Sequence, residues 1–405
     1  MEFGKVASFV KKYKTFIFLP IICLLQFLAC FYYDLWIVAT CVAIALIFIS
    51  DFAHIIYYTL FFQMFSVLGK FSVIVTFFAS GMICIKYILG LIKHTEKIYL
   101  LPLALTIFTC IVFSIRHTII DGAGIYQGCS LIVALFLCYL VFVYRDRFKI
   151  SKCADFLICG ILATLAISVF NLLLDGTLLN IFHNLGELRR LKLLTANENS
   201  LSIYCSLALS IYITRIINGK GNLIKNILFG LIAISVGLST LSKCFLIVCA
   251  FMLVYLFVML IWKHKLKSIY FILPAIAILI VMAIIFQTTI DNIIIRLFAK
   301  LDEKLTLSDI TTGRSDLWTI YLNKITSSIP NMLFGVGLFS ERLVEIGPHN
   351  LLVHLLYRMG FLGVFAIGLI AYFYYKSSNK TLKPTIYTAM PVFVFILISM
   401  VENFL

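Results

Sequence analysis

The chain has 405 residues, of which 62% are hydrophobic and 13% are charged, and its formal net charge is +15. A soluble globular domain is about 25% charged, so this chain has too few polar residues to cover a surface in water, and a soluble enzyme is excluded. Apolar stretches of about 18 residues or more recur along the chain, and about 20 apolar residues cross a bilayer as one helix. Because these stretches lack the alternation of barrel strands, they predict an all-α polytopic membrane protein.

Thirteen membrane spans are predicted in chain order, within a single integral membrane domain that covers residues 1–405. They cover residues 15–33, 35–50, 52–68, 71–92, 98–115, 124–144, 153–174, 200–217, 223–241, 244–262, 268–287, 350–375 and 384–404. The second and third spans are short and meet at Asp51, so the chain has about 12 to 13 transmembrane helices. No cleavable signal peptide is expected, because the first apolar stretch lacks a small-residue cleavage site.

The basic residues orient these spans. With the amino terminus in the cytoplasm and a change of side at each span, 19 Lys and Arg residues fall in cytoplasmic segments and six in the outer segments other than the large loop at 288–349. An excess of basic residues is typical of cytoplasmic loops in membrane proteins. The net positive charge is therefore mainly a topological signal, and nucleic acid is not an expected partner.

Two outer segments are long, a first one at 175–199 and a large loop at 288–349. The large loop carries six basic and seven acidic residues, so it is nearly neutral. Its residues 315–327 have apolar side chains at helical spacing, which predicts an amphipathic helix on the membrane or over the helix bundle. These apolar residues are Leu317, Trp318, Ile320, Tyr321 and Ile325. Ser328 and Pro330 then predict its end, and Gly335 and Gly337 predict a tight turn.

Cationic side chains mark three candidate anion sites in the outer segments. The candidates, with the asparagine that follows the first group, are Arg189, Arg190, Lys192, Asn199, Lys243 and Arg314. A guanidinium binds the oxygens of a phosphate through two parallel hydrogen bonds. The structural alternatives are lipid-headgroup contacts for the first group, a snorkelling side chain for Lys243 and ordinary loop scaffolding for Arg314.

His349 is the candidate general base of the large loop. It lies between Pro348 and Asn350, a possible helix cap, directly before a predicted span. An imidazole with a pKa near neutral at the membrane surface can accept a proton from a sugar hydroxyl, and the structural alternative is an interface anchor. Asn350, His354 and Arg358 recur every fourth residue, so they share one helix face as candidate substrate or structural contacts.

Several kinds of site have no sequence signal. There is no glycine-rich nucleotide loop, Walker motif or metal-ligand spacing, so no nucleotide donor, metal or cofactor is expected. The 12 cysteines lack a CxxC motif or neighbouring histidines. They therefore predict small buried side chains rather than a disulfide framework or a metal cluster.

The ordered motifs resemble the O-antigen polymerase and O-antigen ligase superfamily of bacterial envelope glycosyltransferases, and the resemblance is detailed only in the carboxy-terminal half. The matching features are Arg189/Arg190 with Asn199, Ser242-Lys243, Gly313-Arg314 with Trp318, Gly335-x-Gly337, His349-Asn350 and Gly360-x-x-Gly363. Two positions depart from the pattern. Lys243 replaces the usual arginine, and Glu198 precedes Asn199 where proline is common.

The resemblance implies a glycosyltransferase C class fold in the bacterial cytoplasmic (inner) membrane, with the active site facing the periplasm or exterior. The implied substrate is an undecaprenyl-pyrophosphate-linked oligosaccharide, and the implied partners are a chain-length regulator and a flippase. His349 is then the expected base, oriented by Asn350. Arg189, Arg190, Lys243 and Arg314 are expected at the diphosphate, and Asn199, His354 and Arg358 are expected to contact substrate.

Three functions fit this reading. A polymerase transfers the glycan to another lipid-linked repeat and makes O-antigen for lipopolysaccharide, or a capsule, and it is the preferred interpretation. A ligase instead transfers the polymer to the lipid A core. A polysaccharide flippase or transporter would also be polytopic and basic inside, but transporters often have two similar halves and polar sites near the midplane.

Overall fold

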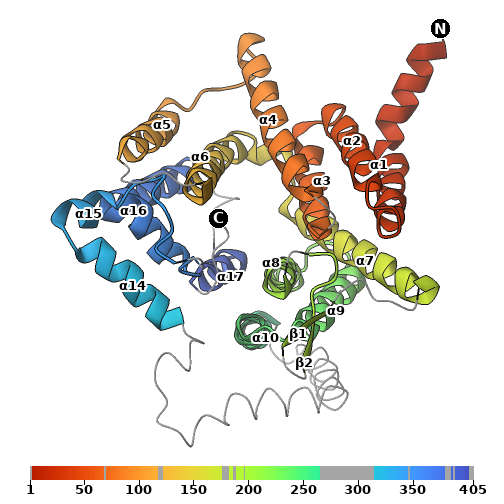
Figure 1. The fold of residues 1–405 in the computed structure, drawn as a ribbon. Helices are drawn as coiled ribbons and strands as arrows, with labels where there is room; N and C mark the ends of the chain where they lie inside the picture. Colours follow the sequence, from red (N-terminus) through yellow and green to blue (C-terminus); the bar gives the residue numbers. More distant parts are fainter. Residues whose placement is uncertain are drawn as a thin grey trace, which may run out of the picture. The chain divides into compact units, whose positions relative to one another are not determined.

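The computed structural model describes residues 2–67, 70–116, 122–175, 182–185, 188–195, 197–264, 314–344, 347–378, 385 and 388–400 (Figure 1). The described chain divides into two compact units. Unit 1 comprises Met1–Ile98 and Leu140–Cys249, and unit 2 comprises Tyr99–Tyr139 and Ala250–Leu405. Both units are helical, and a two-stranded antiparallel hairpin in unit 1 is the sheet that the described residues form.

Unit 1 holds the first helices of the chain and the hairpin. Its elements are α1 (Glu2–Ala29), α2 (Leu35–Phe48), α3 (Phe52–Phe62), η1 (Gln63–Phe65), α4 (Phe71–Ile92), η2 (Arg145–Arg147), α7 (Ile150–Asp175), β1 (Phe182–Leu185), β2 (Leu188–Leu191), α8 (Glu198–Ile217) and α9 (Leu223–Ser239). The first part of α10 (Lys243–His264) also belongs to it. Asp51 caps α3 and separates it from α2, so the second and third predicted spans are two helices.

Unit 2 contains the helices around the described part of the large loop. They are α5 (Leu100–Ile115), most of α6 (Gly122–Val143), α14 (Arg314–Thr326), α15 (Ile329–Phe334), α16 (Leu351–Ser377) and α17 (Met390–Ser399). A helix is confirmed at the predicted place as α14, and it buries Tyr321 and Ile325 while Ile320 is exposed. The predicted stop at Ser328 is also confirmed, because its hydroxyl caps the next helix, α15, by accepting from the Asn331 amide.

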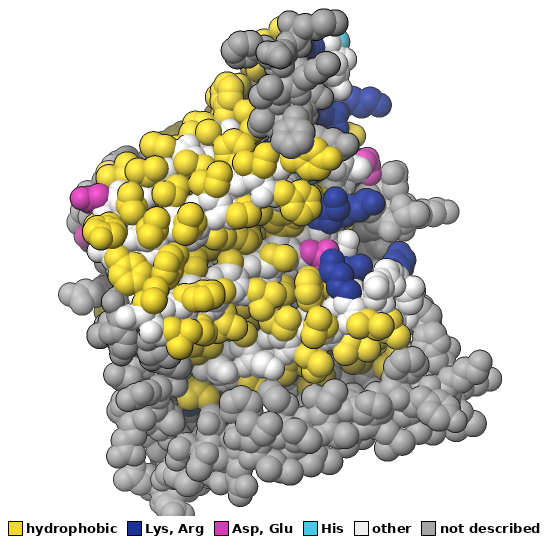
Figure 2. Space-filling model, turned by 90° about the vertical axis from the view of Figure 1, so that its right-hand side faces the viewer, with side chains coloured by type: hydrophobic (Ala, Val, Ile, Leu, Met, Phe, Trp, Pro, Cys, Tyr) yellow, Lys and Arg dark blue, Asp and Glu magenta, His cyan; other side chains and the backbone are white. Residues whose placement is uncertain are grey.

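The membrane character predicted from hydropathy is confirmed by these helices. Six described helices are long and apolar enough to cross a membrane, and six shorter apolar helices accompany them. Together they match twelve of the thirteen predicted spans. The span predicted at 268–287 lies outside the described residues. Figure 2 shows a broad hydrophobic face with Lys and Arg side chains gathered along one margin, as expected where helices leave a bilayer.

Loops meet at two opposite ends of unit 1. The end we call the hairpin end comprises β1, β2, residues 193–199 and residues 240–243, and here the Val67 amide donates to the Leu194 carbonyl at 3.0 Å. The end we call the basic end comprises residues 51–54, 93–97, 145–152 and 215–225, and here Arg147 pairs with Glu96 at 2.8 Å. This grouping agrees with the predicted change of side at each span.

Asp155 ties three helices together near the basic end. Its carboxylate on α7 accepts from the Tyr212 hydroxyl of α8 at 3.0 Å and from the Lys225 ammonium of α9 at 2.7 Å. Arg215 of α8 lies 3.7 Å from the same carboxylate. One half-buried acid therefore lies between two cations and connects α7 to the ends of two neighbouring helices.

Two glycines set the geometry of unit 2. Gly360 interrupts α16 with a left-handed backbone (φ 62°), and Gly335 ends α15 with φ 76°. A Cβ on either glycine would overlap backbone atoms of the other segment, and the Val336 amide donates to the Tyr357 carbonyl at 2.7 Å. The Gly-x-Gly and Gly-x-x-Gly motifs therefore meet, because only glycine allows this close backbone contact.

Candidate functional site

The hairpin end of unit 1 is built around Arg190. In the β1–β2 register His183 lies opposite Arg190, and Asn184 lies opposite Arg189. The Arg190 side chain donates from Nε to the Thr240 carbonyl at 3.0 Å and from a terminal nitrogen to Asn199 Oδ1 at 3.3 Å. The arginine segment and the start of α8, which form one motif in the sequence, are thus joined by one side chain to the 239–243 turn, which forms another.

Glu198, which the sequence shows only as a departure from the family pattern, forms an ion pair with Arg190. Its carboxylate lies 2.6 Å from an Arg190 terminal nitrogen, and both side chains are largely buried. The two charges are close together and largely shielded from water. The positive charge of Arg190 is therefore already balanced by Glu198 before any anion binds. The sequence signal for this residue was an acidic side chain in the first turn of α8, where the helix dipole favours negative charge.

The other cations at the hairpin end differ in exposure. Lys243 is the first residue of α10, and its side chain is exposed. It follows a tight turn in which Leu241 takes a left-handed backbone (φ 50°). Lys192 is half-buried. The side chain of Arg189 lies outside the described residues.

Unit 2 brings the start of α14 to the His349 loop. The Trp318 indole donates from Nε1 to the Pro348 carbonyl at 2.8 Å. Arg314 lies one turn before Trp318 on the same helix, about 6 Å along its axis. Two motifs whose contacting residues are 30 positions apart in the sequence thus lie against each other. Trp318 packs against a buried cluster formed by Tyr321, Ile325, Val336, Val353 and Tyr357.

His349 has an unusual backbone. Its φ is +47°, a left-handed conformation that costs a residue with a Cβ about 1–2 kcal/mol. Its side chain is half-buried. Strained backbone held in place by its surroundings is frequent at active sites, where it fixes the direction of one side chain.

Asn350 directly after it is fixed by two elements. Its Oδ1 accepts from the Val353 amide at 3.1 Å, which confirms the predicted cap of α16. Its Nδ2 donates to the Met400 carbonyl at the end of α17 at 2.8 Å. The amide therefore uses one oxygen and one nitrogen contact to hold the base of the His349 loop.

His354 and Arg358 lie deeper on the same helix, and they are 2% and 1% exposed. Arg358 donates to the Leu338 carbonyl at 3.0 Å, to the Ser340 carbonyl and to Gln127 Oε1. These contacts attach the 338–340 segment to α16 and α6. Gln127 and Ser340 carried no sequence signal, because a neutral polar residue shows its role only when its partner is known.

The predicted site residues accordingly form two groups. Arg190, Asn199 and Lys243 belong to unit 1, and Arg314, His349, Asn350, His354 and Arg358 belong to unit 2. Comparison of the chain with protein-family models, curated proteins and solved structures finds no match. Among the described residues, no group of three or more His, Cys, Asp or Glu side chains is placed to hold a metal ion.

Proposed function

We propose that the chain is a membrane glycosyltransferase that polymerises an envelope polysaccharide, O-antigen or capsule. It transfers an undecaprenyl-pyrophosphate-linked glycan to the sugar hydroxyl of another lipid-linked repeat at the outer face of the bacterial cytoplasmic membrane. The observation that supports this most directly is the hydrogen bond from Trp318 to Pro348. It joins a helix that begins with a cation to a loop that carries a histidine in a fixed, strained backbone.

The chemistry follows from these two groups. The His349 imidazole takes the proton of the acceptor hydroxyl as its oxygen bonds to the anomeric carbon of the donor glycan. The bond from that carbon to the diphosphate breaks at the same time, and the negative charge grows on the leaving lipid diphosphate. The Arg314 guanidinium stabilises that charge through hydrogen bonds that a phosphate accepts well.

The unit 1 cations carry a separate part of the proposal. Arg189, Arg190 and Lys243 are assigned to the diphosphate on the strength of their motifs, and Asn199 to the segment that orients Arg190. The Arg190–Glu198 pair refines this assignment, since the carboxylate opposes an incoming anion. Asn350, His354 and Arg358 are assigned to substrate contact on the strength of their shared helix face, and Asn350 also holds the base of the His349 loop.

The test uses the purified full chain in vesicles with a lipid-linked repeat. His349→Asn is the sharpest variant, because asparagine adopts a left-handed backbone readily but is no base at neutral pH. We expect elongation to fall by at least about 100-fold, the usual contribution of a general base, with unchanged thermal stability. The matched control is His94→Asn, which changes an exposed histidine with φ +53° in unit 1.

Three outcomes would redirect the proposal. If His349→Asn elongates the glycan at the wild-type rate, His349 is not the general base. Transfer to the lipid A core, with no elongation of lipid-linked repeats, makes the chain a ligase. Movement of the lipid-linked repeat between leaflets, without any new glycosidic bond, makes it a transporter.

A further inference from the structure

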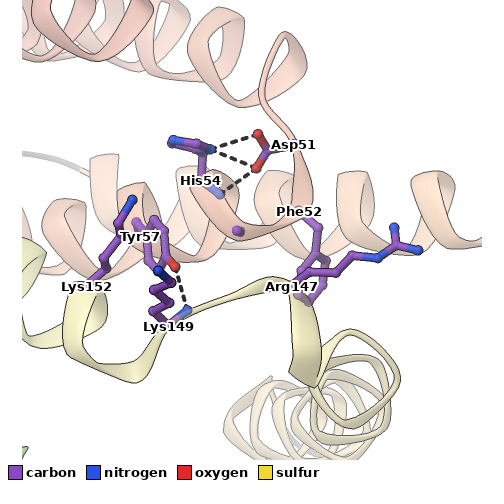
Figure 3. Close-up of a pocket in the computed structure, with 8 residues that line it drawn as sticks. Asp51, Phe52, His54, Tyr57, Arg147, Lys149 and Lys152 are labelled. Carbon is purple, nitrogen blue, oxygen red and sulfur yellow. Dashed lines mark hydrogen bonds and ion pairs between the residues drawn. The ribbon is translucent and has the colours of Figure 1, made fainter.

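A pocket with several charged lining residues lies at the basic end of unit 1, and none of these residues is assigned a role in the function proposed above. Its cavity of about 280 Å³ is close to the lower limit of small-molecule sites, so it suits a compact group. The lining residues are Asp51, Phe52, Ala53, His54, Tyr57, Arg147, Lys149 and Lys152 (Figure 3). They come from the start of α3 and from the segment that leads into α7.

The pocket has an excess of positive charge. Its one carboxylate, Asp51, accepts from the His54 amide at 3.0 Å and lies 2.8 Å from His54 Nδ1. Arg147 pairs with Glu96 at 2.8 Å. Lys149 and Lys152 have no carboxylate partner among the described residues, so their charges remain for a ligand.

The cationic side is held in position before any ligand arrives. The backbone amide of Lys149 donates to the Tyr57 hydroxyl at 2.7 Å, and the Lys152 ammonium lies 5.9 Å from the centre of the Tyr57 ring. Figure 3 shows these three residues grouped on one side of the pocket. The pocket also lies at the amino-terminal ends of α3 and α7, where unpaired amides add partial positive charge.

Exposed apolar side chains flank the charged ones. Phe48 and Ile49 lie just before Asp51, and Ile150 lies between Lys149 and Lys152, and all three are exposed. In Figure 2 basic side chains follow the margin of the hydrophobic face. A ligand with a phosphate and acyl chains matches both the charged and the apolar surface, whereas a free anion would contact only the charged one.

We propose that this pocket binds the phosphate of an anionic phospholipid headgroup, with the acyl chains against Phe48, Ile49 and Ile150. Lys149 and Lys152 hold the phosphate oxygens, and Arg147 borders the site. Basic pockets at the positively charged ends of membrane helices commonly take such lipids. The site is independent of the proposed glycan chemistry, because it uses none of the same residues.

The test is native mass spectrometry of the purified full chain with phosphatidylglycerol or phosphatidylcholine. We expect at least tenfold tighter binding of phosphatidylglycerol, and loss of that preference in the double variant Lys149→Gln/Lys152→Gln. The double variant Lys149→Arg/Lys152→Arg keeps the charge and should keep the preference. The matched control is Lys93→Gln/Lys97→Gln, which removes the same charge from two exposed lysines at the same end.

A second measurement needs no variant. Acetylation of wild-type lysines in nanodiscs should be slower at Lys149 and Lys152 with phosphatidylglycerol than with phosphatidylcholine, and equal at Lys93 and Lys97. Equal acetylation at all four positions would overturn the site. If inorganic phosphate at an equal concentration displaced phosphatidylglycerol, the pocket would be a site for a free anion and not for a lipid.

Discussion

The Trp318 indole and the Pro348 carbonyl are joined by a 2.8 Å hydrogen bond that ties α14 to the residue before His349. Trp318 also packs at the edge of the buried cluster that Tyr321 and Tyr357 share, so its ring is held on one side by apolar contacts. The indole N–H thus fixes the His349 loop on the side of α14, while Asn350 fixes it at α16 and α17.

Trp318→Phe tests this dependence. The variant keeps a ring in the apolar contact but leaves the Pro348 carbonyl without its donor, which should lower the free energy of unfolding by about 1 kcal/mol. The elongation rate should fall by a larger factor than this small loss of stability explains. The reason is that the loop that carries His349 loses a contact that fixes its direction. Trp262→Phe, at an exposed position of α10, is the control for both thermal denaturation and activity. Equal effects of the two variants would contradict the role of Trp318.

Gly360→Ala tests the backbone contact in unit 2. An alanine there takes a left-handed backbone and overlaps the Gly335 segment, so we expect destabilisation of about 2 kcal/mol or more. Gly368→Ala, on the same helix with nothing within 4 Å of the added Cβ, should instead be neutral or stabilising by up to about 1 kcal/mol. Thermal denaturation in one detergent compares the two. If Gly360→Ala melted like Gly368→Ala, the contact would have no energetic role.

Glu198→Gln tests whether Arg190 meets an anion. Glutamine keeps an oxygen for the guanidinium but removes the charge that opposes a diphosphate. We therefore expect the KM for the lipid-linked donor to fall by about fivefold, the effect of ~1 kcal/mol. Glu96→Gln makes the same change in the Arg147 pair at the basic end and should leave the KM unchanged. An unchanged KM with reduced stability in Glu198→Gln would make Arg190 a purely structural residue.

Asp51→Ala tests the cap of α3 and its pH dependence. Hydrogen bonds from His54 hold the pKa of Asp51 well below its usual range. Because the folded-state pKa is depressed, the stabilisation is fully present above the unfolded value of about 3.9 and is lost as pH falls below it. Asp51→Ala should lower stability by about 1 kcal/mol at pH 7 and by less at pH 3.

The control for this pair of measurements is Asp34→Ala. Asp34 also precedes a helix, α2, but its side chain makes no cap hydrogen bond. Its removal should change thermal stability little at either pH. A loss of the same size from both variants would show that the Asp51 cap has no specific effect.

The sequence was sufficient for features that depend on local patterns. Hydropathy predicted the spans, helical spacing predicted α14, and residue chemistry predicted the stop at Ser328 and the cap at Asn350, because each depends on residues within one or two turns. The hairpin at 182–191 was missed although it had a local signal. Two short stretches flank a two-residue connection that begins with Gly186, a typical hairpin pattern.

The partners of the buried charges depended on long-range packing. Arg358 was placed correctly on a face with His354, but its contact with Gln127 joins positions 231 residues apart. Gly335 was predicted in a turn, but its contact with Gly360 required the fold. Hydropathy records which segments are apolar, and it does not record which of them become neighbours.

Asp155 has a consequence for the order in which the chain is assembled. Its first cationic neighbour, Arg215, follows on α8, and Lys225 follows 70 residues after Asp155 on α9. Because α7, α8 and α9 follow one another in the chain, all three are available for these contacts before α14 and α16 are made. We therefore expect this three-helix group to be complete during insertion, while the residues of α14 and α16 are still to be translated.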